Sequence, residues 1–229
     1  MITPHKWNLS IEEAKELQRE LAGKVILEDQ FDDIRFVAGV DMAINENNGM
    51  ARAAIVLFSF PELTMLEKHV YEEPLRMDYI PGLLSFRELP ALLGAFQQLK
   101  QKPDLVMADG QGIAHPRRLG IATHLGLLID TPTIGCAKSI LIGSHEPVGE
   151  KVGDWEPLFY KHEVIGAALR TRAKVKPMYI SQGHKISLDS SIKYVLACGG
   201  GYRLPETTRQ ADKLSKDNDW RETIGEASE

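Results

Sequence analysis

Three segments that favour β-strands follow one another near the start of the chain. The first, residues 34–44, is rich in β-branched residues and ends in a polar turn at 45–49. The other two span 52–60 and 64–72. Short polar connections of this kind join neighbouring strands that run in opposite directions. The pattern therefore predicts an antiparallel meander of three strands.

Helical spacing of apolar residues appears on both sides of this meander. Ser10 and Glu13 form a capping box, in which each side chain accepts a backbone N–H of the other residue, and they open the first helix. A longer apolar stripe covers residues 83–100 with the period of a helix. Ser85 and Glu88 offer a second capping box, which predicts that this helix starts there.

The next part of the chain alternates short strands with helices. Residues 105–108 and 133–136 read as strands, and residues 119–128 between them read as a helix. Strands that alternate with helices pair in parallel through crossover connections. Further strands and two C-terminal helices complete the pattern. This element order predicts an α/β protein with a ribonuclease H-like fold, whose mixed central sheet has three antiparallel strands followed by parallel βα units, flanked by helices.

Composition adds the number of domains and the expected surroundings. The chain has 229 residues, of which 43% are hydrophobic and 26% are charged, and no repeat or linker divides it. We expect one domain over residues 1–216 and a disordered acidic tail over 217–229. No apolar run approaches the roughly 18 residues of a membrane-spanning helix, and no secretory signal is present. These features favour a cytoplasmic protein that does not bind membranes.

The charge distribution is compatible with a polyanionic partner. The formal net charge is −5, but residues 161–216 contain 11 Lys and Arg against 4 Asp and Glu. A basic stretch in an acidic chain is compatible with nucleic acid on one face, although many solvated faces also carry excess lysine. Cys136 and Cys198 are far apart and form no C-x-x-C pair, which excludes a zinc ribbon.

Two aspartates, one within a predicted strand and one directly after another, are candidate metal ligands. Asp41 lies in the first strand among apolar neighbours, where a charge is costly unless it is paired or binds a metal. Asp109 directly follows the strand 105–108 and opens an Asp-Gly-Gln-Gly run. In the predicted fold these two strands are neighbours, so both carboxylates can share a hard cation such as Mg²⁺ or Mn²⁺. The alternatives are a strand-end turn or an ion pair for Asp41 and a plain Asp-Gly turn for Asp109.

Two well-known phosphate-binding patterns are absent from the sequence. The glycines from Gly110 to Gly112 lack the third glycine of the dinucleotide fingerprint, and no Gly-Lys-Ser/Thr occurs. Nucleotide-dependent enzymes of those two classes are therefore excluded.

Five segments together resemble the endonuclease V (deoxyinosine 3′-endonuclease) family. The resemblance extends from about residue 10 to about residue 216 and rests on the segments 37–41, 79–88, 104–120, 134–138 and 201–212. It implies a ribonuclease H-like fold. It also implies an enzyme that cuts the second phosphodiester bond 3′ to a deaminated purine, chiefly hypoxanthine, in DNA. Such an enzyme uses Mg²⁺, for which Mn²⁺ substitutes, leaves 5′-phosphate ends and does not excise the base.

The resemblance also assigns roles to charged residues. Asp41 and Asp109 match the metal-binding aspartates, and Glu88 matches the third catalytic carboxylate. Asp212 matches an acidic or histidine position near the metal, and Lys138 matches a lysine beside the scissile phosphate. Taken alone, Glu88 reads equally well as a helix cap, Asp212 as a solvated helix charge and Lys138 as a surface lysine.

A wedge against the base stack is implied by Tyr79, Ile80 and Pro81. A wedge of this kind fills the space that a modified base leaves when it is extruded from the duplex. The family usually has proline before the tyrosine, whereas this chain has Asp78, which predicts a looser turn and an added negative charge near the phosphates.

The glycine-rich run and the basic residues after it complete the implied DNA-binding set. Gly110 and Gly112 are expected to line the pocket of the extruded base, because glycines permit close approach. His115 and Arg117, together with Arg118, are expected to reach phosphates, which position a nucleic acid without specifying its sequence. The corresponding alternative for His115 is a packed or helix-capping histidine.

Three other functions remain open at this point. The protein could cut inosine-containing RNA, because recognition of the 2′-hydroxyl depends on local geometry. It could bind inosine without cutting, although the full set of candidate catalytic residues argues against this. It could be another ribonuclease H-like nuclease such as a junction resolvase, which would need neither wedge nor base pocket. A monomer is expected in each case.

Overall fold

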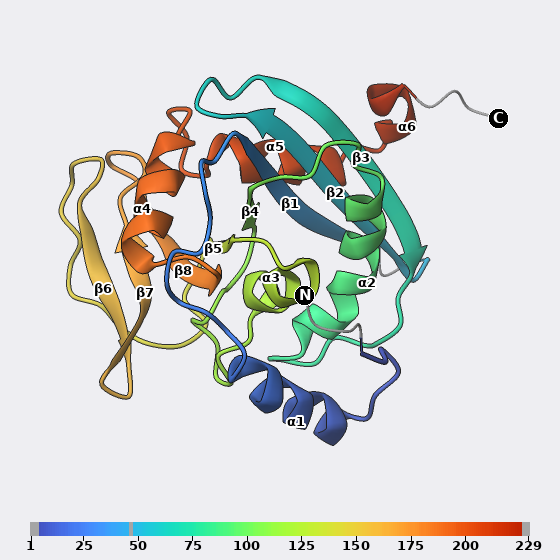
Figure 1. Cartoon of the computed structure of the whole chain (residues 1–229), viewed down its shortest axis with the longest axis horizontal. Helices are drawn as coiled ribbons and strands as arrows, with labels where there is room; N and C mark the ends of the chain where they lie inside the picture. Colours follow the sequence, from blue (N-terminus) through green and yellow to red (C-terminus); the bar gives the residue numbers. More distant parts are fainter. Residues whose placement is uncertain (1–4, 46–47, 226–229) are drawn as a thin grey trace.

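A computed structural model describes residues 5–45 and 48–225, and these form one sheet with helices on both faces (Figure 1). Within them the sheet has eight strands in the order β3-β2-β1-β4-β5-β8-β7-β6. The elements in chain order are α1 (Ile11–Ala22), β1 (Phe36–Asn45), β2 (Met50–Ser59), β3 (Met65–Pro74), α2 (Leu84–Gln97), β4 (Leu105–Ala108), α3 (Ile121–Ile129), β5 (Thr133–Ala137), β6 (Trp155–Tyr160), β7 (Glu163–Leu169), β8 (Met178–His184), α4 (Leu188–Ala197), α5 (Glu206–Ser215) and α6 (Trp220–Ile224).

The predicted meander and the predicted parallel units are both confirmed. β1 pairs antiparallel with β2, and β2 pairs antiparallel with β3. β1 and β4 run parallel, as do β4 and β5, and the register places Val40 of β1 opposite Ala108 of β4. Beyond β5, the strands β8, β7 and β6 follow antiparallel. The sheet is therefore mixed, and the α/β, ribonuclease H-like fold class is confirmed.

Alternate residues of the central strands point to two different helix layers. Val37 of β1 and Met107 of β4 belong to one core cluster with residues of α4 and α5. Ala38 and Val106 belong to a second cluster, together with residues of α2 and α3. Because side chains alternate along a strand, Asp41 lies on the α5 side of the sheet. The helix layers therefore decide which side chains can meet Asp41.

A glycine allows α5 to lie directly on β1. A Cβ built on Gly39 would lie 2.1 Å from the carbonyl oxygen of Thr207 on α5, so no other residue fits without displacing the helix. Thr207 is fully buried at this contact. The close approach sets the position of the acidic residue that follows on α5.

One of the two predicted capping boxes is confirmed and the other is wrong. Ser10 and Glu13 form both capping hydrogen bonds at α1. α2 instead begins at Leu84 without a side-chain cap, because the hydroxyl of Ser85 lies 3.0 Å from Nδ1 of His124 and is committed to it. The carboxyl of Glu88 therefore takes no part in capping α2.

The C-terminal segment differs from the expected tail where the structure describes it. Residues 220–224 form α6, and Trp220 is only 5% exposed because it packs into the core cluster beside α5. Residues 226–229 of the expected tail lie outside the described residues. Across the described ranges, no helix combines the length and the apolar character that crossing a bilayer requires.

Candidate active site

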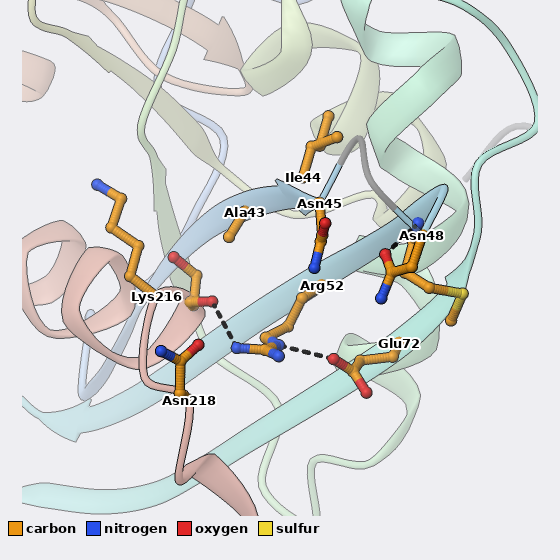
Figure 2. A pocket seen from close by; sticks show the side chains of 10 residues that line it. Ala43, Ile44, Asn45, Asn48, Arg52, Glu72, Lys216 and Asn218 are labelled. Carbon is orange, nitrogen blue, oxygen red and sulfur yellow. Dashed lines mark hydrogen bonds and ion pairs between the residues drawn. The ribbon is translucent and has the colours of Figure 1, made fainter.

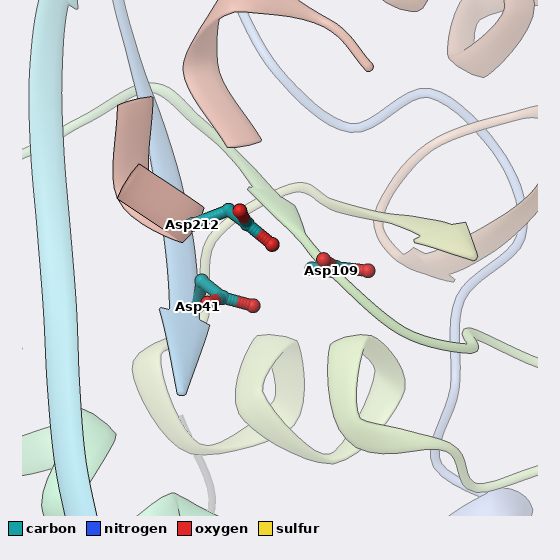
Figure 3. Close-up of side chains that lie close together, drawn as sticks. All are labelled: Asp41, Asp109 and Asp212. Atoms are coloured by element: carbon teal, nitrogen blue, oxygen red, sulfur yellow. The ribbon is translucent and has the colours of Figure 1, made fainter. Parts of the chain in front are cut away.

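Three aspartates from distant parts of the chain meet at the strand ends, as Figure 3 shows. Asp41 lies on β1, Asp109 directly follows β4, and Asp212 lies on α5. Each offers a carboxylate oxygen within 4.8 Å of the oxygens of the other two. The parallel pairing of β1 with β4 brings the first two together, and α5 packed on β1 adds the third. We call these three residues the carboxylate cluster.

Two lysines partly neutralise the carboxylate cluster. Nζ of Lys138, at the end of β5, forms ion pairs with Asp109 and, at 2.7 Å, with Oδ1 of Asp212. Nζ of Lys216 lies 2.6 Å from the same Asp212 oxygen. Burial alone would lower the pKa of Lys138, but its hydrogen bonds to the two carboxylates raise the pKa above its ordinary value. Lys138 is therefore a permanent cation at the cluster.

Asp41 carries the largest cost of burial among the three aspartates. It is 9% exposed, and Oδ2 accepts a 2.6 Å hydrogen bond from the hydroxyl of Ser215. Burial raises the pKa of Asp41 to about 6, and the charges of Asp109 and Asp212 act in the same direction. A cation placed here would oppose each of these effects.

Glu88 lies close to Asp41 and Asp109, but it comes from α2, on the other side of the sheet. It lines a small pocket of about 70 Å³ together with Asp41 and Asp109. Burial raises the pKa of Glu88 to about 8, and the neighbouring Asp41 adds to the shift. In the metal-free protein this side chain is therefore largely a neutral acid at pH 7.

The donor set fits a hard divalent cation. Asp41, Asp109 and Asp212 supply closely spaced carboxylate oxygens, the ligands that Mg²⁺ and Mn²⁺ prefer. Burial is the main cause of the raised pKa values of Asp41 and Glu88, and the neighbouring carboxylate charges add to it, so a bound cation would favour the ionised form of both. Family resemblance implied only the first two aspartates as ligands, and the structure brings Asp212 into the same cluster.

A second pocket, of about 80 Å³, adjoins the carboxylate pocket. We call it the loop pocket, because its lining comes mainly from the turn before α2 and from the loops after β4 and β5. Leu84 and Ile121 line both pockets, so the two are contiguous. The lining of the loop pocket consists of Tyr79, Gly82, Leu84, Ser85, Gln111, His115, Leu119, Gly120, Ile121 and Leu141.

The turn at 79–82 forms one wall of the loop pocket and is firmly anchored. Tyr79 is 63% exposed at this wall, and Ile80 packs beside the buried Phe86. The carbonyl oxygen of Gly82 accepts hydrogen bonds from Nε2 of His115 at 3.1 Å and from Nη2 of Arg117 at 2.7 Å. It also accepts one from the Gln18 amide at 3.0 Å. Gly82 has φ +79°, which favours glycine.

His115 and Arg117 are thus directed at protein rather than at solvent. His115 is 4% exposed, and its Nδ1 accepts a 3.2 Å hydrogen bond from the backbone N–H of Arg117. Burial lowers the pKa of His115 to about 4, with a further contribution from the Arg117 charge. Arg118 pairs with Glu163 at 2.6 Å. Phosphate contacts by these residues stay a prediction, and their observed partners make the first two anchors of the turn.

The glycines of the run hold the loop instead of facing the pocket. Among the described residues, Gln111 and Gly120 contribute to the lining, whereas Gly110 and Gly112 do not. A Cβ on Gly112 would lie 2.1 Å from the carbonyl oxygen of Gln182, so the loop after β4 passes directly against β8. The lining of a base by Gly110 and Gly112 stays untested.

Sequence reasoning missed several side chains that support these pockets. Ser215 follows Asp212 by three residues on α5, and this helical spacing is a signal that could have revealed it. His124 is buried, and Nε2 lies 2.7 Å from Nε2 of His5. Nothing in the local sequence of His5 indicates that it supports a residue of α3.

Comparison with known proteins agrees with this site. The chain matches the Endonuclease V family model over residues 19–213. Endonuclease V from Nostoc sp. is 55% identical over 213 residues, which cover 93% of this chain and 96% of that relative.

Solved structures give the same result. Endonuclease V from Streptomyces avermitilis superposes with a TM-score of 0.88 and 39% identity, covering 97% of this chain and 96% of that one. Endonuclease V from Ciona intestinalis has been solved in complex with a 23mer DNA containing an inosine followed by a ribo-adenosine. It superposes with a TM-score of 0.80 and 30% identity, covering 95% of this chain and 99% of that one. Matched along almost its whole length in sequence and in fold, the chain belongs to the endonuclease V family.

Proposed function

We propose that this protein is a Mg²⁺-dependent repair endonuclease that cuts DNA at the second phosphodiester bond 3′ to deoxyinosine. The observation that carries the proposal is the contiguity of the loop pocket with the pocket that contains Asp41, Glu88 and Asp109. When the loop pocket holds a base, the adjoining sugar-phosphate backbone lies at the pocket of Asp41, Glu88 and Asp109. Recognition and hydrolysis then occur on one strand.

In this proposal the carboxylate cluster holds the metal. Asp41 and Asp109, joined by Asp212, are the ligands that these residue types and their mutual distances favour. When bound, the divalent ion would polarise a phosphate oxygen and lower the pKa of a water molecule. The hydrogen bond from Ser215 holds the Asp41 carboxylate in one orientation.

Lys138 and Glu88 supply the remaining charge and proton. The ammonium of Lys138 lies at the cluster and neutralises negative charge that develops on the phosphate during attack. Glu88 has a pKa raised to about 8 by burial, which suits the exchange of a proton with water near neutral pH. Both residues touch the reacting groups in this proposal.

The loop pocket takes the base, and the turn at 79–82 acts as the wedge. The exposed ring of Tyr79 offers a stacking surface at the mouth of the pocket. Backbone groups and the side chain of Gln111, which is held by a 2.9 Å hydrogen bond from its amide nitrogen to the Ser139 carbonyl, would read the edge of hypoxanthine. The three hydrogen bonds to the Gly82 carbonyl stabilise the turn even though Asp78 replaces the usual proline.

A second candidate is cleavage of inosine-containing RNA. The Ciona relative was solved with a strand in which a ribonucleotide follows the inosine, which makes a ribose at that position a specific possibility here as well.

The test compares end-labelled DNA and RNA oligonucleotides that carry one central inosine or one adenosine. Each is incubated with Mg²⁺, Mn²⁺ or EDTA. We expect a metal-dependent nick one nucleotide beyond the inosine, leaving a 5′-phosphate, with DNA cut faster. Faster cutting of RNA would favour the second candidate. Inosine-selective binding without any nick in either metal would refute the endonuclease proposal and leave a binding module.

A further inference from the structure

A hollow of about 350 Å³ lies beside the carboxylate cluster, and Figure 2 shows the residues that line it. We call it the meander hollow, because the ends of β1, β2 and β3 form its floor. Its polar lining includes Asn48, Arg52, Glu72, Lys216 and Asn218. Lys216 also pairs with Asp212 of the carboxylate cluster, and the proposed cleavage uses none of the other four.

The sheet register explains why the hollow exists. Ala43 of β1 pairs with Arg52 of β2, and Arg52 pairs with Glu72 of β3, so the three form one row across the sheet. The preceding row on the same face of the sheet, two residues earlier along β1, contains Asp41. α5 covers the Asp41 row but ends at Ser215, and the small side chain of Ala43 leaves the next row open.

The floor of the hollow is preorganised. Nε of Arg52 donates to Glu72 at 2.7 Å, and Nη1 donates to the Asp217 carbonyl at 2.7 Å (Figure 2 shows the first of these contacts). These bonds fix the guanidinium between β3 and the segment after α5. A fixed polar floor of this kind favours a polar ligand over an apolar one.

The rim supplies a cation and amides. Lys216 and Asn218 are both exposed, and both line the hollow, as does the amide of Asn48. Lysine contacts phosphate, and amide side chains both donate to and accept from sugars and base edges. The lining therefore suits a nucleotide.

The hollow and the carboxylate cluster share two walls. Ser215 lines the hollow and donates to Asp41, while Lys216 lines the hollow and pairs with Asp212. In the strand order, β2 and β3 lie on one side of β1, and β4 and β5, whose loops form the loop pocket, lie on the other. A nucleic acid strand that enters from the loop pocket and crosses the cluster therefore arrives in the hollow.

We propose that the meander hollow binds the first nucleotides on the 3′ side of the cut bond and so positions the scissile phosphate over the carboxylates. This inference rests on the proposed function, which sets the direction of the strand. It assigns to Asn48, Lys216 and Asn218 the contacts with the part of the substrate that leaves as the 5′-phosphorylated product.

The test measures binding in EDTA, where no strand is cut. Two 5′-fluorescein single-stranded DNAs contain one inosine; one ends one nucleotide after the inosine, just before the cut bond, and the other extends eight nucleotides after the inosine. Fluorescence anisotropy should show that the wild type binds the longer strand about tenfold more tightly, as expected for added backbone and stacking contacts. Equal affinity of the wild type for both strands would overturn the proposal.

Two variants locate the effect in the hollow. Ala43→Phe fills it, and Asn218→Asp adds a negative charge to its rim. Each should remove most of the length advantage and leave the affinity for the shorter strand unchanged. Circular dichroism and thermal melting check that Ala43→Phe is folded, and the exposed Asn218→Asp does not depend on repacking. A length advantage that survives both substitutions contradicts the assignment.

A matched pair of lysines separates a local contact from general charge. Lys213 lies on α5, three residues before Lys216, but it lines a different pocket, near Met65 and Gln210. Lys216→Ala should lose the length advantage and Lys213→Ala should keep it. Equal losses in the two variants would show that net charge, not the hollow, produces the effect.

A final measurement separates this proposal from the proposed function. An inosine-free hexanucleotide with a 5′-phosphate should bind the wild type more tightly than Ala43→Phe. This difference is expected whether or not the enzyme prefers inosine. Loss of inosine selectivity with the hexanucleotide difference intact would refute the proposed function only, and the reverse result would refute only the role of the hollow.

Discussion

The carboxylate pocket and the loop pocket are neighbours that share Leu84 and Ile121, yet they are built in opposite ways. The carboxylate pocket brings Asp41, Glu88 and Asp109 together, and burial there raises the pKa values of Asp41 and Glu88. The loop pocket takes apolar side chains, backbone and a neutral histidine from loops tied by hydrogen bonds. The difference indicates a division of labour, in which charge serves the reaction and a shaped, neutral surface serves recognition. Substitutions in the two regions should therefore fail in different ways.

The largest effect is expected from Asp41→Asn. Removing one carboxylate from the cluster should reduce the cleavage rate by about 10³-fold or more, because a metal ligand is lost. The substitution also removes a buried charge, so the melting temperature in EDTA should not fall. Rates on an inosine oligonucleotide and a thermal melt measure both, with Asp189→Asn on α4 as the control. An active Asp41→Asn enzyme would remove the metal assignment.

Lys138→Ala should have the next largest effect. The loss of a cation at the phosphate should lower kcat by about 10²-fold and change the affinity for uncut DNA much less. Lys138→Arg should restore part of the rate because it keeps the charge. Single-turnover rates and anisotropy in EDTA separate the two quantities. A variant that loses only affinity would place Lys138 among the positioning residues.

Tyr79→Ala tests whether the loop pocket serves recognition of the substrate. Loss of a stacking surface should weaken binding of inosine DNA about tenfold or more, while the rate at saturating enzyme stays close to that of the wild type. Phe159→Ala is a matched control, because Phe159 is an exposed aromatic residue on β6. If Tyr79→Ala lowers the saturated rate as strongly as Lys138→Ala, the division of labour does not hold.

The smallest effect concerns stability and pH. The pKa of Glu88 is raised from an ordinary 4.5 to about 8, so its contribution to stability is present below pH 4.5 and is lost as pH rises through 8. In EDTA the melting temperature of Glu88→Gln, taken relative to that of the wild type at the same pH, should therefore rise by about 5 °C between pH 5 and pH 8.5. Buried histidines change the melting temperatures of both proteins equally with pH, so the test uses only the difference between the two melting temperatures. Added Mg²⁺ should shrink this difference, and a difference independent of pH would contradict the assigned shift.

Much of the fold was predictable because local pattern and topology agree. The strand at 105–108 has the predicted bounds, and the other central strands differ from prediction by two residues or fewer at each end. The start of α2 lies within two residues of its predicted place, but the predicted capping box is wrong because the Ser85–Glu88 pattern competes with tertiary partners. His124 takes the serine hydroxyl, and the carboxylate pocket takes the glutamate.

Sequence by itself determined the element order, and with it the meeting of Asp41 and Asp109. Strands joined by helical crossovers run parallel, and Asp109 at the carboxyl end of β4 therefore lies beside Asp41 in the middle of β1. Only the tertiary structure decided that Ser215 would hold Asp41, 174 residues away, that Gly82 would be the anchor of the turn, and that a hollow would open beyond α5. The physical reason is that strand pairing follows from local pattern, whereas the place where a helix crosses and ends above a sheet depends on contacts between distant parts of the chain.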